Sequence, residues 1–153
     1  IRFAFVEYLM FLPILFLLLL AVAGVLQLLG KPPPQQPVFT LYFSEGRAPV
    51  LRALVFLVTV IGPVAEEVFF RGILYRWLRT RWGIGKALAG SAFFFALLHG
   101  DPVAFVPILG LGLLFGWVYE RTGSLAAPIS IHVAHNAGML YLASVVKDLA
   151  KVA

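Results

Sequence analysis

The chain contains no cysteine, and this absence removes several classes of protein at once. Without thiols there is no disulfide framework, no cysteine nucleophile and no cysteine-ligated metal site. Aspartate occurs only as Asp101 and Asp148, both near the ends of apolar segments, which excludes a catalytic aspartate pair within a membrane. The zinc-protease motif His-Glu-x-x-His is missing. The Gly-x-Ser-x-Gly setting of many serine hydrolases is absent around Ser91, Ser124, Ser130 and Ser144.

Charge is also scarce, because only 12% of the 153 residues are charged whereas 61% are hydrophobic. Such a chain has too little polar surface to cover a soluble globule, so we predict an integral membrane protein. The net charge of +5 does not indicate a nucleic-acid partner. A short basic segment between two apolar runs is typical of a cytoplasmic loop, and it contains Arg76, Arg79, Arg81 and Lys86.

The apolar runs predict an all-α, polytopic transmembrane bundle. A helix needs about 20 residues to cross the hydrocarbon core, and about five spans are predicted, at residues 3–29, 50–79, 84–99, 103–119 and 124–146. The proline-rich residues 30–49 are expected to form a loop outside lipid, without regular helix. We therefore expect residues 1–49 to be an accessory transmembrane helix with its loop, and residues 50–153 to be a core containing the last four spans.

Two features are expected to shape the spans of this core. Pro63 follows Gly62 in the second span and removes one backbone hydrogen bond, so it can kink the helix just before a group of charged residues. Gly112 and Gly116 are four residues apart in the fourth span, a spacing that permits close approach of a neighbouring helix.

The charged residues after Pro63 are the chief anomaly of the sequence. Glu66, Glu67 and Arg71 lie within an apolar stretch, where ionisable groups cost roughly 2.5 to 3.5 kcal/mol each and by default mark a functional site. Glu67 and Arg71 share one helix face, with the acid in the favourable N-terminal position. Glu66 points about 100° away. The alternative to a functional site is a purely structural cluster, in which Arg71 neutralises one carboxylate. This alternative leaves Glu66 without a partner on its own helix.

Further polar residues occur in two other spans. His99 ends the third span, and a single histidine there is most often a capping or interface residue. His132 and the only asparagine, Asn136, are four apart in the last span and face the same way. For them the structural alternative is an interhelical hydrogen bond worth about 0.6 kcal/mol. His135 lies about 60° from His132, and we expect it to bond a neighbouring helix rather than join a site.

Polar groups from three spans are expected to converge on the bundle interior or on a water-filled cavity. A carboxylate there can take a proton from water, and histidine and asparagine N–H groups can stabilise the negative oxygen that forms when water attacks a carbonyl. The chemistry that fits is hydrolysis of an acyl bond, with a peptide as the expected substrate.

The motifs, taken together, resemble those of a known family. Glu66-Glu67-x-x-x-Arg71, Phe95-x-x-x-His99 and His132-x-x-x-Asn136 follow one another on successive apolar runs. Phe70-Arg71-Gly72 and the segment from Thr122 to Pro128 also match. This pattern resembles the CPBP intramembrane proteases, the family of the CAAX prenyl endopeptidases and bacteriocin-processing enzymes, over residues 50–146.

The resemblance implies a role for each matched residue. Glu66 would be the base that activates water, His99 would assist it, and His132 with Asn136 would form the oxyanion site. Glu67 and Arg71 would be supporting residues. Zinc has been suspected in the family because two glutamates and two histidines look like ligands, but we favour a mechanism without metal or other cofactor.

The resemblance also implies the setting of the reaction. We expect a multi-pass protein of a bacterial inner (cytoplasmic) membrane, surrounded by lipid, that cleaves a peptide or a membrane protein. Two alternatives are a non-catalytic membrane interaction protein, such as a bacteriocin immunity factor, and a zinc-dependent version of the same protease. The sequence indicates no oligomeric state.

Overall fold

A computed structural model describes residues 1–32, 37–44 and 46–150, and within these ranges every regular element is a helix. The predicted all-α fold is therefore confirmed. Three helical stretches are long and apolar enough to cross a membrane: Arg2–Leu28, Ala48–Leu98 and Ala126–Leu149. The protein is an integral membrane protein, and the number of times it crosses the bilayer stays a prediction.

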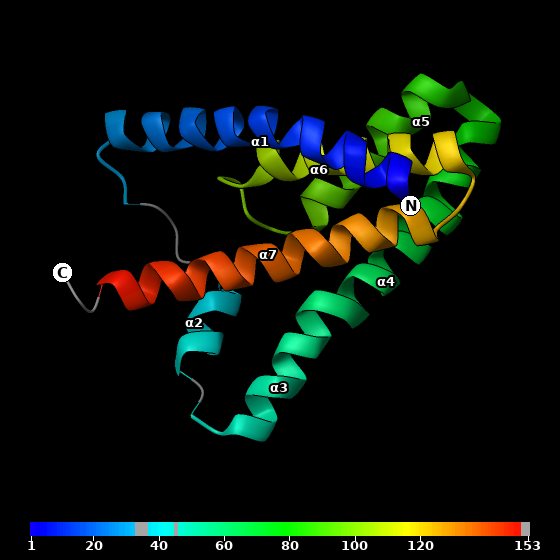
Figure 1. The fold of residues 1–153 in the computed structure, drawn as a ribbon. Helices are drawn as coiled ribbons and strands as arrows, with labels where there is room; N and C mark the ends of the chain where they lie inside the picture. Colours follow the sequence, from blue (N-terminus) through cyan, green and yellow to red (C-terminus); the bar gives the residue numbers. More distant parts are fainter. Residues whose placement is uncertain (33–36, 45, 151–153) are drawn as a thin grey trace.

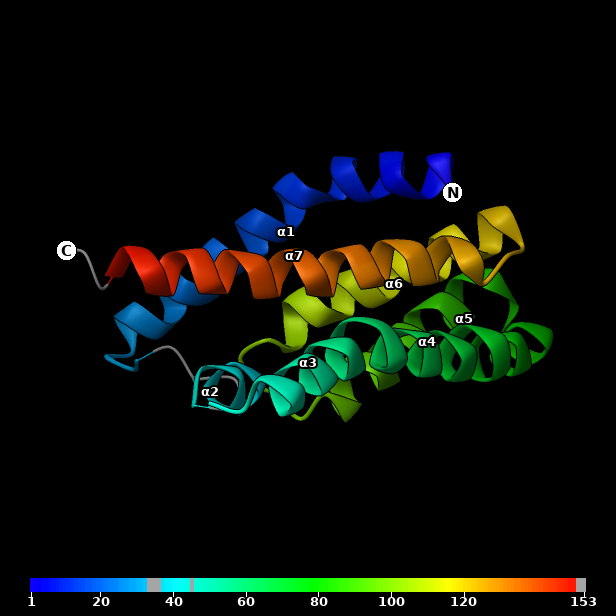
Figure 2. The same cartoon turned by 60° about the horizontal axis from the view of Figure 1, so that its bottom comes forward.

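The first helix, α1 (Arg2–Leu28), lies along the outside of the bundle. Its apolar side chains leave no polar stripe, and most of its leucine and phenylalanine side chains are exposed, as expected for a helix that faces lipid. It packs against α6 (Phe105–Thr122) and α7 (Ala126–Ala150), and Figure 1 shows it beside both. In the view of Figure 2, α1 crosses behind α7, and the segment from α3 to α4 lies on the other side of α7 from the N-terminal half of α1.

The predicted loop at residues 30–49 is partly wrong, because it contains a short helix, α2 (Pro37–Ser44). Proline is tolerated in the first turn of a helix, where its missing N–H group would have no intrahelical partner. The residues from Val38 to Ser44 include no further proline or glycine. The prolines that precede this helix at positions 33 and 34 lie outside the described residues.

One long helical run carries the glutamates. It comprises α3 (Ala48–Phe56), η1 (Leu57–Ile61), α4 (Gly62–Glu67), η2 (Val68–Tyr75) and α5 (Arg76–Leu98). The segments η1 and η2 are π-helical, so their turns are wider than those of an α-helix. Gly62 and Pro63 follow η1, and the expected disturbance of the helix takes the form of this widened turn.

The predicted basic loop at residues 76–86 is partly wrong, because all of these residues except Gly83 are helical and belong to α5. The break between the second and third predicted spans is a single residue, Gly83, whose φ of 74° lies in the left-handed region that glycine adopts without strain. The chain then folds back, so that the Ser91 hydroxyl donates to the Phe70 carbonyl at 3.1 Å.

Close packing of α5 on α6 brings the helix backbones together at the predicted glycine pair. A Cβ atom on Gly112 would lie 3.1 Å from Ala92 Cα, and one on Gly116 would lie 2.9 Å from a Leu88 methyl group. A side chain at Gly112 would press on the backbone of α5, and one at Gly116 would displace the Leu88 side chain. The expectation that Gly112 and Gly116 permit close helix approach is confirmed.

Candidate active site

The two glutamates lie where the long helical run changes its geometry. Glu66 and Glu67 end α4, with η1 before them and η2 after them. Single π-helical turns occur often at functional sites, because they shift side chains away from regular helical positions. Here they allow Glu66 and Glu67 to face different surroundings: the Glu67 side chain is 0% exposed, whereas that of Glu66 is 37% exposed.

Glu67 is the centre of a closed, fully buried cluster. Its Oε1 atom accepts hydrogen bonds from Arg71 Nη1 at 2.8 Å and from His132 Nδ1 at 2.9 Å. Arg71 Nη2 donates to the Gly112 carbonyl at 2.8 Å, and its guanidinium lies 4.6 Å from the centre of the Phe95 ring. Charge-assisted hydrogen bonds and an aromatic face compensate part of the cost of removing two charges from water, while Glu67 Oε2 and Arg71 Nε have no hydrogen-bond partner among the described residues. The cluster ties η2 to α6 and α7.

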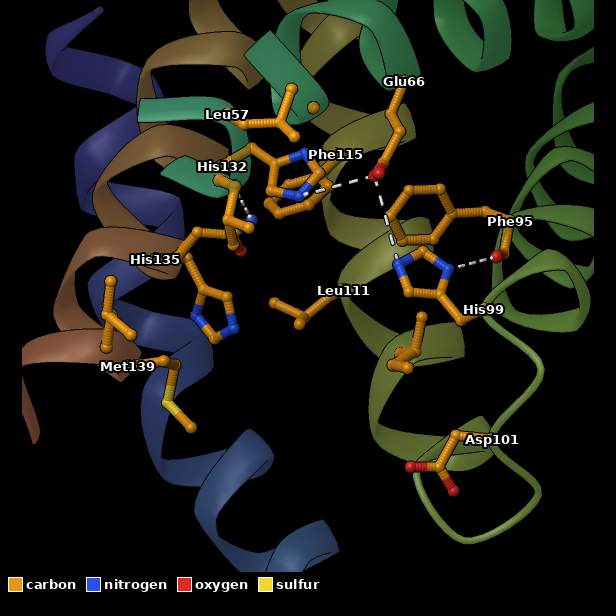
Figure 3. Close-up of a pocket in the computed structure, with 15 residues that line it drawn as sticks. Leu57, Glu66, Phe95, His99, Asp101, Leu111, Phe115, His132, His135 and Met139 are labelled. Atoms are coloured by element: carbon orange, nitrogen blue, oxygen red, sulfur yellow. Dashed lines mark hydrogen bonds and ion pairs between the residues drawn. The ribbon is translucent and has the colours of Figure 1, made fainter. Parts of the chain in front are cut away.

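Glu66 points into a cavity of about 570 Å³, where two histidines approach it (Figure 3). Its Oε2 atom lies 3.7 Å from His132 Nε2 and 4.0 Å from His99 Nε2. The same Oε2 is buried and accepts no hydrogen bond from the described protein atoms. Side chains from α4, the end of α5 and α7 therefore meet at one point of the cavity wall.

The hydrogen bonds on the far side of each ring fix what these histidines present to Glu66. His132 Nδ1 faces the carboxylate of Glu67, and His99 Nδ1 lies 2.6 Å from the Phe95 carbonyl. Both partners are acceptors, so both Nδ1 atoms carry a proton. A neutral imidazole then has a lone pair on Nε2. A neutral His132 with its proton on Nδ1 therefore presents a lone pair to the cavity, and its expected role in the oxyanion site stays a prediction.

Asn136 faces the cavity with only part of its amide free. Its Nδ2 donates to the Val58 carbonyl at 3.0 Å, across to η1. The acceptor Val58 lies in the widened turn before Pro63, where π-helical geometry leaves carbonyls in irregular positions. An amide nitrogen carries two protons, so one remains for a group inside the cavity.

His135 was expected to bond a neighbouring helix, and it does so while also lining the cavity. Its Nδ1 lies 3.1 Å from the Tyr8 hydroxyl on α1. Sequence reasoning missed Tyr8, because one tyrosine in an apolar helix carries no periodic signal. It also missed Asp101, which lines the far part of the cavity.

A known family matches the segment of the chain that contains these polar residues of α4, α5 and α7. Residues 48–138 match the family model described as type II CAAX prenyl endopeptidase Rce1-like. The chain belongs to this family. All six predicted site residues lie within the matched segment of this Rce1-like protein, whereas α1 and Tyr8 precede it.

Curated relatives of the Rce1-like chain are bacterial proteins, and the names of two of them describe membrane peptidases. It is 35% identical over 89 residues to the membrane-embedded CAAX protease MroQ of Staphylococcus aureus, covering 54% of this chain and 36% of that protein. It is 26% identical over 83 residues to the putative membrane peptidase YdiL of Bacillus subtilis, covering 54% of this chain and 34% of YdiL. An uncharacterised 24.3 kDa Escherichia coli protein is 25% identical over 114 residues, covering 71% of this chain and 52% of that protein. The chain thus matches about a third to a half of each relative's length. No solved structure matches it.

The residues of this family member were also tested as a metal site. Within residues 1–32, 37–44 and 46–150, no three histidine, aspartate or glutamate side chains are grouped so as to hold a metal ion. Neighbouring ligands of a tetrahedral zinc ion, bound at about 2.1 Å, lie about 3.4 Å apart. The distances from Glu66 Oε2 to the two Nε2 atoms are 3.7 and 4.0 Å, which exceed that value.

Proposed function

We propose that this protein is an intramembrane endopeptidase in which Glu66 activates a water molecule for attack on a peptide bond. The observation that carries the proposal is the approach of Glu66 Oε2 to two imidazole Nε2 atoms, at 3.7 and 4.0 Å, inside a cavity of about 570 Å³. The membership of the family supports the same class of reaction.

A water molecule fits the hydrogen-bonding character of these atoms. The Glu66 carboxylate, whose side chain is 37% exposed, accepts, and a neutral His99 accepts through Nε2 because its Nδ1 proton is held by the Phe95 carbonyl. A water molecule can donate one proton to each and turn its lone pair toward a substrate carbonyl. As the water oxygen bonds to the carbonyl carbon, Glu66 takes its proton, and the same proton then goes to the leaving amine.

The negative oxygen of the tetrahedral intermediate needs donors on the opposite side. Asn136 supplies the amide proton that Val58 does not use. His132 supplies an Nε2–H group in its doubly protonated form, in which its Nδ1–H donates to Glu67 and its Nε2 lies 3.7 Å from Glu66 Oε2. Preorganised donors of this kind are worth about 2.7 to 4 kcal/mol each in a water-excluded site.

In this proposal the reaction requires no metal ion or other cofactor. Glu66, assisted by His99, supplies the base, and the oxyanion donors come from Asn136 and His132. The zinc-dependent alternative makes a separate prediction: purified protein would carry stoichiometric zinc in elemental analysis, and a chelator would abolish cleavage. We expect less than stoichiometric metal and unchanged cleavage in the presence of the chelator.

The proposed substrate is a peptide or a membrane protein, met by a multi-pass protein of a bacterial cytoplasmic membrane. The bacterial origin of the relatives supports this setting. One relative is named a CAAX protease. A peptide library that contains matched prenylated and unprenylated peptides would show whether this protein recognises the prenyl group.

The test is cleavage of a peptide library by purified protein in detergent. Parent protein should cleave at least one peptide, and Glu66→Gln should lower that rate by about a hundred- to ten-thousand-fold. Glu7→Gln is the matched control, since Glu7 lies on α1 and does not line the cavity, and it should cleave as the parent does. A folded Glu66→Gln protein that cleaves at the parental rate contradicts the proposal.

A non-catalytic interaction protein is the second candidate, and the closed cluster around Glu67 favours it. That cluster joins η2, α6 and α7 without any reaction. If stability is the only role of the polar residues, Glu66→Gln should lower the unfolding temperature while leaving the cellular phenotype of the parent intact. Unchanged stability with loss of cleavage rejects this candidate.

A further inference from the structure

We propose that Tyr8 and His135 form a substrate-positioning pair, in which Tyr8 holds His135 so that its Nε2–H group donates a hydrogen bond to a backbone carbonyl of the bound peptide. The inference rests on the proposed endopeptidase function and extends it to α1, a helix that precedes the segment matched by the family model.

The geometry places His135 between α1 and the cavity. Its Nδ1 lies 3.1 Å from the Tyr8 hydroxyl, and the two rings meet edge to face with centres 6.0 Å apart. Figure 3 shows the His135 ring near Leu111 and Met139, in a part of the cavity away from Glu66. One ring nitrogen is thus occupied by α1, and the other is available to the cavity.

The Tyr8 hydroxyl decides which nitrogen of His135 carries the proton. Among the described residues, His135 Nδ1 is the only hydrogen-bond partner of this half-buried hydroxyl. If Nδ1 donated to Tyr8, the phenolic proton would have no acceptor there, and an unmet donor is costly in apolar surroundings. Tyr8 therefore donates to Nδ1, and a neutral His135 carries its own proton on Nε2.

His135 thereby differs from the other two histidines of the cavity. His99 and His132 hold a proton on Nδ1 and present an Nε2 lone pair when neutral. His135 presents an N–H group when neutral. When all three rings are neutral, they provide two acceptors beside Glu66 and one donor farther along the cavity, and His132 becomes a donor only in its doubly protonated form.

The surroundings of His135 indicate what this donor would bind. Figure 3 shows Leu111 and Met139 beside the His135 ring, and most of the other residues that line the cavity are apolar. A peptide lying against such a wall can place apolar side chains on it, but each backbone carbonyl loses water and needs a donor. A single neutral N–H group in an apolar wall fits an uncharged carbonyl oxygen and fixes where along the cavity the chain lies.

The pair is first tested without any reaction. Histidine nitrogens are labelled with ¹⁵N, and the tautomer of each of the three rings is determined by NMR. We expect His135 to carry its proton on Nε2 in the parent and to populate the Nδ1 form in Tyr8→Phe, while His99 and His132 stay unchanged. Tyr141→Phe is the matched control, because Tyr141 is exposed on α7. A parental Nδ1 proton on His135, or an unchanged tautomer in Tyr8→Phe, overturns the proposal.

Binding is then measured in the Glu66→Gln background, where turnover is suppressed. The probe is a dansylated, C-terminally amidated hexapeptide of leucine, valine and alanine. His135→Leu should weaken binding about tenfold, the effect of losing one hydrogen bond, while His135→Gln, which keeps an N–H donor, should restore most of it. The proposal is contradicted if the Glu66→Gln protein binds the probe equally well with and without His135→Leu. It is also contradicted if neither protein binds the probe.

Kinetics separate this inference from the proposed function itself. In the cleaving parent, His135→Leu and Tyr8→Phe should raise KM and leave kcat nearly unchanged, whereas Glu66→Gln lowers kcat. A lower kcat with unchanged KM in His135→Leu would overturn the positioning role only. Cleavage by Glu66→Gln at the parental rate would refute the role of Glu66 as the base. The tautomer of His135 would still test the Tyr8–His135 pair independently.

Discussion

Two arginine–glutamate pairs in this protein have the same chemistry and opposite surroundings. Arg71 and Glu67 are both 0% exposed, and their nitrogen and oxygen lie 2.8 Å apart. Arg79 and Glu120 are 2.7 Å apart, but their side chains are 48% and 17% exposed. Each pair has a further partner, His132 in the first case and the Tyr75 hydroxyl in the second.

The difference in exposure determines what each pair can do. A buried pair has lost its hydration, so each charge depends on its partner and the removal of one leaves the other uncompensated. An exposed pair exchanges its partner for water at little cost. The buried cluster therefore fixes the position of His132 beside Glu66, whereas the exposed pair joins α5 to the end of α6 at the surface.

The largest effect is expected from breaking the buried pair. Arg71→Met leaves the Glu67 carboxylate without its cation and should lower the free energy of unfolding by about 3 to 5 kcal/mol, measured by denaturant unfolding in detergent. The double variant Arg71→Met with Glu67→Gln removes both charges and should recover most of that loss. If Arg71→Met is as stable as the parent, the buried pair does not hold these helices together.

A smaller effect is expected where the same arginine meets α6. A Cβ on Gly112 would lie 3.1 Å from Ala92 Cα, so Gly112→Ala should push α6 from α5 and displace the carbonyl that accepts from Arg71. Overpacking of this kind costs about 1 to 3 kcal/mol in unfolding measurements. The control is Gly24→Ala on α1, where no heavy atom lies within 4 Å of the new methyl group. Equal stability of both variants contradicts the close packing.

The exposed pair should matter much less. Arg79→Ala should change the unfolding temperature only slightly, because water and salt replace the lost partner. Measurements at low and high salt should show that the small difference from the parent disappears as salt is added. A loss comparable to that of Arg71→Met would remove the contrast between the two pairs.

The smallest effect is a pH dependence from Glu120, which lies just beyond the predicted span at residues 103–119. Burial raises the pKa of Glu120, but hydrogen bonds from Arg79 and Tyr75 more than offset it, so the pKa lies below its ordinary value. A carboxyl with a lowered pKa in the folded state adds stability at neutral pH and loses it as the pH falls past the usual glutamate range. As the pH is lowered, the unfolding temperature of the parent should therefore fall slightly more steeply than that of Glu120→Gln. Parallel curves of unfolding temperature against pH would contradict this.

The sequence predicted the polar residues of the cavity because lipid makes such residues rare. Helical periodicity placed Glu67 with Arg71 and His132 with Asn136, and the cost of charge in lipid led us to expect Glu66, His99 and His132 to meet. The structure places these three side chains together. Their catalytic roles stay predictions.

The parts that could not be predicted depend on contacts between distant segments. The proton positions on His99 and His132 follow from acceptors at Phe95 and Glu67, and half of the Asn136 amide is used by Val58. None of these contacts has a pattern in the sequence. The short helix α2 was missed because proline usually ends helices, whereas Pro37 begins one.

The central claim is that two adjacent glutamates have different tasks, with Glu66 acting on water and Glu67 holding the bundle and His132 in place. The most direct test is to measure kcat and the unfolding temperature of Glu66→Gln and Glu67→Gln side by side. The account predicts that Glu66→Gln unfolds near the parental temperature and has lost cleavage, and that Glu67→Gln unfolds at a clearly lower temperature. A stable Glu66→Gln protein with the parental kcat would contradict it.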